Sequence, residues 1–306
     1  MHIVVMGAGG VGGYFGAKLA RAGETVTLIA RGEHLTAIQR DGLRIRSSVE
    51  GESVVRLAAV EDVRGLSAAE VILFCVKSFD TETAAERIRP IAGPDTAVLS
   101  LQNGIDNEDT IDEILGPGHA MGGVAQVFAA IDRPGVIAHH FAGRIIFGEL
   151  DGRLTPRAES LARGFARAAI DAELSTDIRR ALWEKYVLIC AVAGMTALTR
   201  CPIGVIRDTP ECWRMLRAIV EEIVALAAAA KAGLAPGIVD QTMQTATAIA
   251  PGNFSSLYQD LSRSKRLELE ALHGHAVRLG ERFGVATPAV AAVYAALKPH
   301  AAGRRA

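Results

Sequence analysis

The residues of this sequence most suited to chemistry lie near its beginning, where a short apolar run leads into a glycine-rich stretch, GAGGVG. The spacing G-x-G-x-x-G between a strand and a helix is typical of a loop that binds the pyrophosphate of a dinucleotide. Its glycines allow a tight turn and a close approach of backbone to ligand, and the helix N-terminus adds N–H groups and a positive dipole end. We expect the cofactor to contact Gly7, Ala8, Gly9, Gly10, Val11 and Gly12.

A charged residue further along indicates which dinucleotide fits. In NAD-binding folds an acidic residue at the end of the second strand holds the adenosine ribose, but here Arg31 follows the strand pattern TVTLI. A guanidinium can pair bidentately with a 2′-phosphate, whereas a carboxylate would repel it. The sequence therefore predicts NADP (NADPH) rather than NAD; the alternative is a solvated surface arginine.

Two more polar residues follow predicted strands, Lys77 after VILFCV and Asn103 after VLSL. Open α/β sheets bind ligands at the carboxyl ends of their strands. Both side chains could therefore reach the phosphate, ribose or carboxamide of the cofactor. The alternatives are an exposed loop lysine and a turn asparagine before glycine.

These positions must be brought together by a sheet. Up to about residue 150, β-branched runs alternate with helical patterns, which predicts a largely parallel sheet with helices on both faces. A β excursion is predicted in LRIRSSVEGESVVRL, and GVIAHH and RIIFGEL are predicted to be an antiparallel pair joined by a Phe-Ala-Gly turn. From about Thr155 helical patterns dominate, with one last short strand in AELSTD. We expect a Rossmann-type NADP-binding domain at 1–174 and an all-helical substrate domain at 175–306.

The amino-acid composition indicates which classes of partner and which cellular compartment to expect. The 33 basic and 34 acidic residues nearly cancel, so bulk charge favours neither nucleic acid nor a membrane surface as a partner. The apolar start is too short for a signal peptide, and the apolar helix from Ala218 is interrupted by charges. We expect a cytoplasmic protein with reduced thiols and no metal, and an alanine-rich helix leaves a homodimer open. Zinc-ligand spacing is lacking around Cys75, Cys190, Cys201 and Cys212.

Taken together, the motifs resemble the ketopantoate reductases, or 2-dehydropantoate 2-reductases. This family of pantothenate biosynthesis reduces a 2-oxo acid to a 2-hydroxy acid with NADPH. The resemblance covers almost the full chain and is carried, in order, by GAGGVGG, Arg31, CVKSFD, LQNGID, ALWEKYVL, CPIGVIR, NFSSLYQD and KRLELEALHG. It implies an NADPH-dependent 2-oxo-acid reductase whose substrate lies in a cleft between the two domains.

The resemblance also implies residue roles. Lys185 would be the general acid and the cation that anchors the substrate, which suits the negative charge that grows on a carbonyl oxygen as hydride arrives. Asn253, Ser255 and Ser256 would hold the carboxylate or hydroxyl of the acid. Glu268 would lie near the nicotinamide ribose and substrate as a second catalytic residue. Without the resemblance, Lys185 would be a solvated lysine, Asn253 a helix cap and Glu268 a helix-surface carboxylate.

Three positions depart from the family pattern, which has asparagines where this chain has Ile189, Ala193 and Ile203. A buried amide left unpaired by the wrong ligand costs roughly 1 to 3 kcal/mol, so a site without these amides should accept a substrate that lacks the matching hydroxyl. His273 also stands where the family often has asparagine. It is either a polar substitute in the site or a partly exposed structural residue.

Two other functions stay open at this point. A β-hydroxyacid dehydrogenase would join similar halves, but its glycine-rich run before the catalytic lysine is missing from this sequence. A non-catalytic NADP-binding sensor could keep the fold without turnover. The presence of Lys185 and Glu268 favours an enzyme.

Overall fold

The computed structural model describes residues 1–303, and the chain divides into two compact units. Unit 1 comprises Met1–Gln102 and Asp106–Ile178. Unit 2 comprises Asn103–Ile105 and the chain from Arg179 onward. Separate clusters of buried apolar side chains form the cores of the two units.

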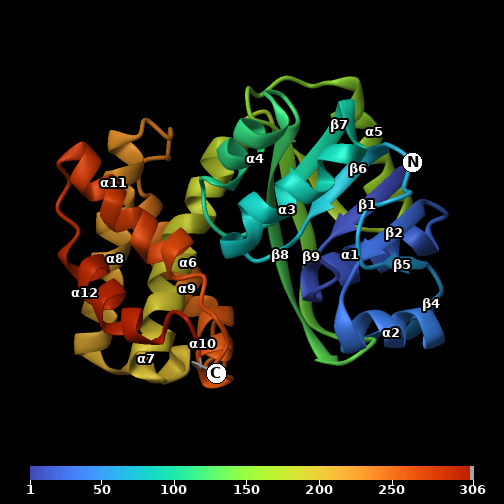
Figure 1. The fold of residues 1–306 in the computed structure, drawn as a ribbon. Helices are drawn as coiled ribbons and strands as arrows, with labels where there is room; N and C mark the ends of the chain where they lie inside the picture. The colour runs from blue at the N-terminus through green and yellow to red at the C-terminus, as the bar shows by residue number, and fades with distance from the viewer. Residues whose placement is uncertain (304–306) are drawn as a thin grey trace. The chain divides into compact units, whose positions relative to one another are not determined.

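Unit 1 is built on one sheet with the strand order β4-β3-β9-β8-β7-β6-β1-β2-β5, and β10 pairs with β9 (Figure 1). Among the described strands, β3/β4 and β8/β9 are antiparallel and the other neighbours are parallel, which confirms the predicted largely parallel sheet. The strands are β1 His2–Met6, β2 Thr25–Ile29, β3 Leu43–Ser47, β4 Gly51–Val55, β5 Ala58–Val60, β6 Ala69–Phe74, β7 Ala92–Ser100, β8 Ala120–Arg133, β9 Val136–Glu149 and β10 Asp171–Leu174.

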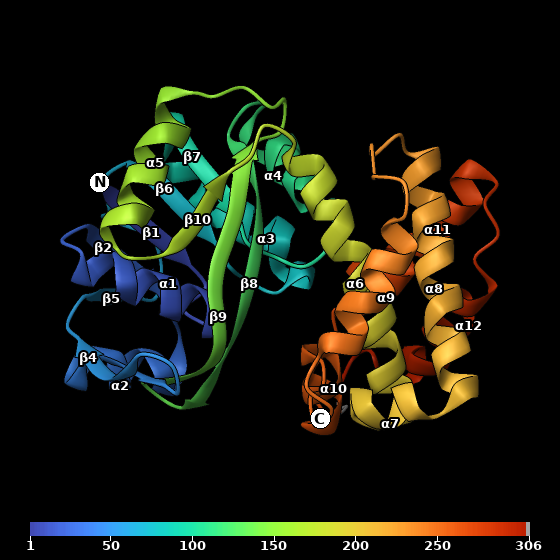
Figure 2. The same cartoon turned by 180° about the vertical axis from the view of Figure 1, so that it is seen from behind.

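Helices cover both faces of this sheet because its central strands are apolar on both sides. In β1, Ile3 and Val5 point into one core, while Val4 and Met6 point into the other. Helices α1 and α5 lie over the first face and α3 and α4 over the second, as opposite views show (Figures 1 and 2). The helices of unit 1 are α1 Gly10–Arg21, α2 Gly32–Asp41, α3 Thr81–Ile88, α4 Asn107–Leu115 and α5 Pro156–Arg167, with short 3₁₀ turns η1 Ser78–Asp80 and η2 Arg89–Ile91.

One strand prediction is wrong. GVIAHH and RIIFGEL belong to a single strand, β9, which runs through the expected turn at Phe141–Gly143 and pairs antiparallel with β8. The register shifts after Gln126, so Gly143 is accommodated as a bulge. Its φ is +138°, and a Cβ there would lie 2.7 Å from the Tyr14 hydroxyl oxygen. Glycine therefore marks a bulge that packs against Tyr14 and not a chain reversal.

Unit 2 is helical, as predicted. Its longest helix, α6, is apolar and long enough to cross a membrane by length and composition, but 61% of its most apolar stretch is buried inside the protein. This burial is what a core helix shows. The helices are α6 Ile178–Thr199, α7 Ile203–Asp208, α8 Pro210–Ala229, α9 Ile238–Ala248, α10 Ser256–Ser262, the π-helical turn η3 Glu270–Gly274, α11 His275–Phe283, α12 Pro288–Leu297 and the 3₁₀ turn η4 Lys298–His300.

Candidate active site

The glycine-rich loop connects β1 to α1, and its glycines meet different demands. Gly7 has φ +103°, and a Cβ there would lie 3.0 Å from the backbone of Cys75. A Cβ at Gly12 would lie 2.2 Å from the Gly7 carbonyl oxygen. At Gly9, by contrast, a Cβ would meet no described atom within 4 Å. Gly7 and Gly12 thus allow close packing, while Gly9 borders open space where a pyrophosphate can approach the backbone.

The start of α1 is suited to an anion. The helix begins at Gly10, and its N-cap Gly9 offers no side chain to the N–H groups of the first turn. That turn carries no acidic side chain. A Cβ at Gly10 would lie 2.0 Å from the Ala129 carbonyl oxygen, so β8 passes directly against this helix end. The residues present therefore fit the pyrophosphate of a dinucleotide.

Arg31 lies where β2 ends and α2 begins. It is the N-cap residue of α2 and is exposed. Its guanidinium makes no ion pair with any of residues 1–303, whereas Arg40 on the same helix is paired with Asp41 at 2.7 Å. Arg31 is therefore available to a ligand phosphate.

Lys77 belongs to the same edge of the sheet. The strands β1, β2 and β6 are parallel neighbours, so their carboxyl ends lie side by side. The glycine loop follows β1, Arg31 follows β2, and the half-buried Lys77 follows β6 at the start of η1. The structure thus brings the predicted nucleotide residues of unit 1 to one edge.

In unit 2, the catalytic candidate Lys185 lies on α6 and is half-buried. Ile189 and Ala193 follow it at successive turns of the helix, so the three share one face. Ile189 and Ala193, which stand where the resembled family carries asparagines, therefore present apolar groups on the helix face of the lysine.

Thr196, on the same face of α6, makes a contact with Ser255 that the sequence did not predict. The hydroxyl oxygens of Thr196 and Ser255 lie 2.7 Å apart, and Thr196 is fully buried. Ser255 is also the N-cap of α10, and its Oγ accepts a hydrogen bond from the Tyr258 N–H at 3.1 Å. Thr196 thereby fixes the hydroxyl of a predicted substrate residue. The helical spacing from Lys185 was the only sequence signal for it.

Asn253 and Ser256 flank this contact and are both exposed. The expectation of Asn253 as a helix cap is wrong, because Ser255 caps α10, which begins at Ser256. The backbone of Asn253 instead accepts a hydrogen bond from the Ile203 N–H at 3.0 Å. This bond ties the predicted substrate loop to the start of α7.

Glu268 is 6% exposed, so the alternative of a helix-surface carboxylate is wrong. The Asn103 side-chain amide donates to its Oε2 at 3.4 Å, which joins two predicted site residues within unit 2. The π-helical turn η3 begins two residues later, and such turns are frequent at functional sites.

His273 lies inside η3 and is fully buried, so the expectation of partial exposure is wrong. Its Nε2 lies 2.9 Å from the Cys190 carbonyl oxygen, and its Nδ1 has no partner among the described residues. Burial lowers the pKa of His273 to about 4, so the ring is neutral at physiological pH and Nε2 donates. The hydrogen bond from His273 to the Cys190 carbonyl and the one from the Tyr186 hydroxyl to the Leu272 carbonyl together join η3 to α6.

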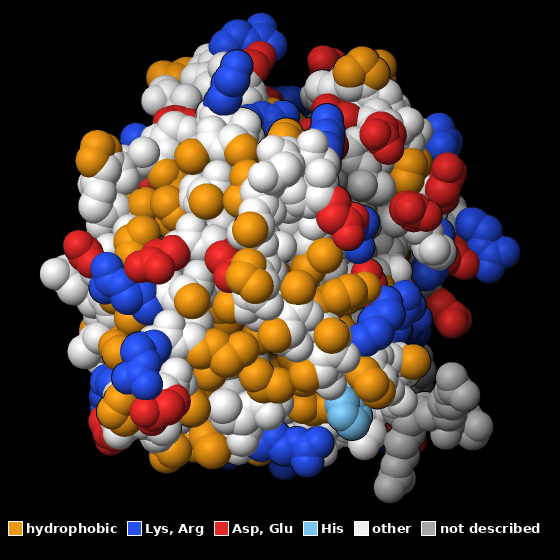
Figure 3. All heavy atoms as spheres, turned by 90° about the vertical axis from the view of Figure 1, so that its left-hand side faces the viewer, with side chains coloured by type: hydrophobic (Ala, Val, Ile, Leu, Met, Phe, Trp, Pro, Cys, Tyr) orange, Lys and Arg blue, Asp and Glu red, His pale blue; other side chains and the backbone are white. Residues whose placement is uncertain are grey.

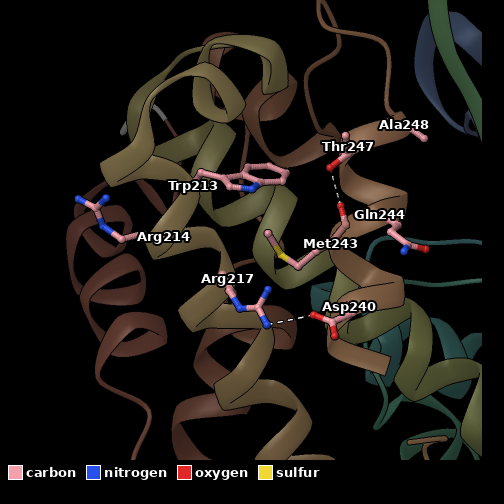
Figure 4. A pocket seen from close by; sticks show the side chains of 8 residues that line it. All are labelled: Trp213, Arg214, Arg217, Asp240, Met243, Gln244, Thr247 and Ala248. Atoms are coloured by element: carbon pink, nitrogen blue, oxygen red, sulfur yellow. Dashed lines mark hydrogen bonds and ion pairs between the residues drawn. The ribbon is translucent and has the colours of Figure 1, made fainter. Parts of the chain in front are cut away.

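Unit 2 also contains a cavity of about 650 Å³ between α8 and α9 (Figure 4). The side chains of Trp213 and Met243 form part of its apolar lining, and an ion pair of 3.0 Å joins Arg217 on α8 to Asp240 on α9. None of the predicted site residues lines this cavity. No group of His, Cys, Asp and Glu within residues 1–303 is arranged to hold a metal ion.

Comparison with known proteins finds two family models that match this chain. The model described as ketopantoate reductase PanE/ApbA matches residues 3–152, and its C-terminal counterpart matches residues 177–301. The 2-dehydropantoate 2-reductase of Halobacterium salinarum is 32% identical over 95% of both chains.

Solved structures agree with this match. A PanE/ApbA family ketopantoate reductase from Ralstonia eutropha JMP134 is 35% identical, covers 98% of both chains and has a TM-score of 0.90. A D-mandelate dehydrogenase, solved in a ternary structure with NADH and anilino(oxo)acetate, is 25% identical, with the same coverage and TM-score.

Proposed function

The chain belongs to the ketopantoate reductase family, and on that premise we propose that it reduces a 2-oxo acid to a 2-hydroxy acid with Lys185 as the general acid. It is an NADP-dependent oxidoreductase that acts on CH–OH groups. The observation that carries this conclusion is the match of residues 3–152 and 177–301 to the two models of one reductase family.

The nucleotide residues of unit 1 hold NADPH, which supplies a hydride to the carbonyl carbon of the substrate. Backbone N–H groups at the start of α1 bind the pyrophosphate, and Arg31 pairs with the 2′-phosphate. Lys77 adds a cation at the same edge of the sheet. Asn103, held by its hydrogen bond to Glu268, binds the nicotinamide half of the cofactor.

Lys185 is the general acid of this reaction. As the C–H bond forms, the carbonyl π-electrons move to oxygen, and the Lys185 ammonium stabilises this charge and transfers its proton to the oxygen. The products are the 2-hydroxy acid and NADP⁺, and the lysine regains a proton from solvent. Ser255, Ser256 and Asn253 hold the substrate carboxylate, and Thr196 fixes the Ser255 hydroxyl for this purpose.

We further propose that the preferred substrate has an apolar side chain. Ile189 and Ala193 share the helix face of Lys185, and the buried Ile203 lies beside the Asn253 loop. None of them can hydrogen-bond a substrate hydroxyl as asparagine can. The likeness to a D-mandelate dehydrogenase that binds anilino(oxo)acetate favours the same direction.

Steady-state NADPH oxidation with a panel of 2-oxo acids tests both proposals. Ketopantoate, 2-oxoisovalerate, phenylglyoxylate and pyruvate vary the side chain at constant reaction chemistry. We expect kcat/KM for 2-oxoisovalerate or phenylglyoxylate to exceed that for ketopantoate by about tenfold or more. If ketopantoate is the best substrate, the proposed specificity is wrong but the reaction class stands. If NADPH binds but none of the four acids is reduced, the proposed substrate specificity is wrong.

We also propose a cytoplasmic homodimer. All four cysteines are thiols, as expected in a reducing compartment. Hydrophobic side chains spread over a face of unit 2 that includes α12 (Figure 3). Exposed alanines on α8 and α12 are Ala225, Ala228, Ala229, Ala292, Ala295 and Ala296. Light scattering across a concentration series tests the dimer, and a constant monomer mass would refute it.

A further inference from the structure

A histidine that sequence reasoning passed over links separate parts of the nucleotide site. His34 lies in the first turn of α2, shortly after Arg31. Its Nε2 lies 2.9 Å from the Ala8 carbonyl oxygen in the glycine-rich loop. Its Nδ1 lies 2.9 Å from the backbone nitrogen of Gly135, which is 101 residues further along the chain. One imidazole therefore bonds to the glycine-rich loop and to the turn between β8 and β9.

These two bonds are compatible with only one protonation state. The Gly135 N–H is a donor, so Nδ1 must accept, and the Ala8 carbonyl is an acceptor, so Nε2 must carry the proton. A second proton on His34 would point at the Gly135 N–H and break that bond. The clamp formed by Ala8, His34 and Gly135 thus exists only while the ring is neutral.

The surroundings of His34 favour the neutral ring. Burial lowers its pKa, and the hydrogen bond to the Ala8 carbonyl opposes this only in part. The charged residues near His34 are Arg31, the N-cap of α2, Glu33 in the first turn of α2, and Asp132 and Arg133 at the end of β8. Strand β5 and the glycine-rich loop carry none. All four are exposed, so water screens their effect on the ring.

Each bonded segment carries part of the nucleotide site. Ala8 lies between Gly7 and Gly9, and α2 starts directly after Arg31. The β8–β9 turn continues a strand whose Ala129 carbonyl packs against the first residue of α1. The His34 bonds therefore fix the pyrophosphate loop relative to the arginine and to the strand that lies against the helix end.

We propose that His34 is a positioning residue for the cofactor, a neutral clamp that presets the distance between the pyrophosphate loop and Arg31. This inference rests on the proposed use of NADPH. A site held in advance binds its ligand without the entropic cost of ordering two loops. Loss of the clamp should therefore weaken cofactor binding more than it slows the chemical step.

The first test compares the NADPH dissociation constants of His34→Ala, His34→Gln and the control Thr36→Ala by fluorescence titration. Thr36 is exposed on the same helix, and its hydroxyl donates to the Gly32 carbonyl at 3.3 Å. With two hydrogen bonds lost, His34→Ala should bind NADPH about tenfold more weakly or worse, with kcat at saturating NADPH nearly unchanged. The glutamine amide offers an NH₂ group that can donate to the Ala8 carbonyl and an oxygen that can accept from the Gly135 N–H, so His34→Gln should recover most of the affinity.

The second test uses pH, because protonation breaks the Gly135 hydrogen bond of histidine, whereas the glutamine of His34→Gln does not titrate. Because burial lowers the pKa of His34, wild-type affinity for NADPH should fall only at a pH below the ordinary histidine pKa, and there more steeply than that of His34→Gln. The ratio of the two dissociation constants at each pH removes the titration of the ligand phosphate itself. This comparison remains valid even if His34→Ala does not fold.

The outcomes separate this inference from the proposed function. If wild type fails to bind NADPH, the proposed cofactor is wrong. If wild type binds NADPH but His34→Gln shows the same loss with acid, the clamp does not act through its neutral ring and the inference is wrong. Equal affinity in wild type and folded His34→Ala would overturn it as well. Weak binding by His34→Ala, recovery by glutamine and a pH-dependent ratio would establish it.

Discussion

Replacing Arg31 by alanine tests the cofactor assignment with little structural disturbance. The side chain is exposed, makes no ion pair with residues 1–303 and forms no helix-capping bond, so the melting temperature should not change. Its expected effect is confined to the 2′-phosphate, the one group that distinguishes NADPH from NADH. Charge-assisted hydrogen bonds are stronger than neutral ones, but water screens an exposed pair. We therefore expect the dissociation constant of NADPH to rise roughly tenfold.

The assay is parallel titration of NADPH and NADH into wild type, Arg31→Ala and the control Arg40→Ala. Arg40 is exposed on the same helix and is paired with Asp41. Its replacement by alanine removes one positive charge, as Arg31→Ala does, and so controls for the change in net charge. NADH affinity should be unchanged in all three proteins. If Arg31→Ala weakens both cofactors equally, or if Arg40→Ala weakens NADPH as much, Arg31 does not bind the 2′-phosphate. A weaker effect at high salt would support the charge pair.

Three further predictions concern unit 2 and one buried acid. Lys185→Ala removes the proton donor, and Lys185→Arg replaces it with a guanidinium, which is a poor proton donor, so both variants should lower kcat by roughly 10²- to 10⁴-fold with normal NADPH binding. Activity within a few-fold of wild type in either variant would remove the lysine from the mechanism. Thr196→Val should raise KM for the best 2-oxo acid roughly fivefold, because the Ser255 hydroxyl loses its partner, and an unchanged KM would refute that positioning. Burial raises the pKa of Glu108 to about 7, so its contribution to stability is complete below the ordinary carboxyl pKa and is lost as pH rises through 7. Glu108→Gln should therefore be more stable than wild type at pH 8, by up to about 3 kcal/mol, and equal to it near pH 4.5; thermal unfolding that shows a pH-independent difference would contradict this.

The features that the sequence determined by itself are those set by local chemistry. The glycine spacing before α1 predicts the nucleotide loop because a positive φ at Gly7 and close packing at Gly12 exclude side chains at those positions. Alternating strand and helix periodicities predict the parallel sheet, and the helical periodicity of the second half predicts unit 2. The role of Arg31 was predicted for a related reason, since the segment that follows the second strand of this motif is expected next to the ribose; this role stays a prediction.

Tertiary structure decided the features that depend on distant segments. Whether Gly143 is a turn or a bulge depends on its register against β8 and on its close contact with Tyr14. Glu268 has the local sequence of a surface carboxylate, yet packing within unit 2 buries it against Asn103. His34 carries no local signal of its role, because its two partners are the Ala8 carbonyl and an N–H 101 residues away. Hydrogen bonds between remote backbone atoms follow from strand register and core packing, and local periodicity carries no information about either.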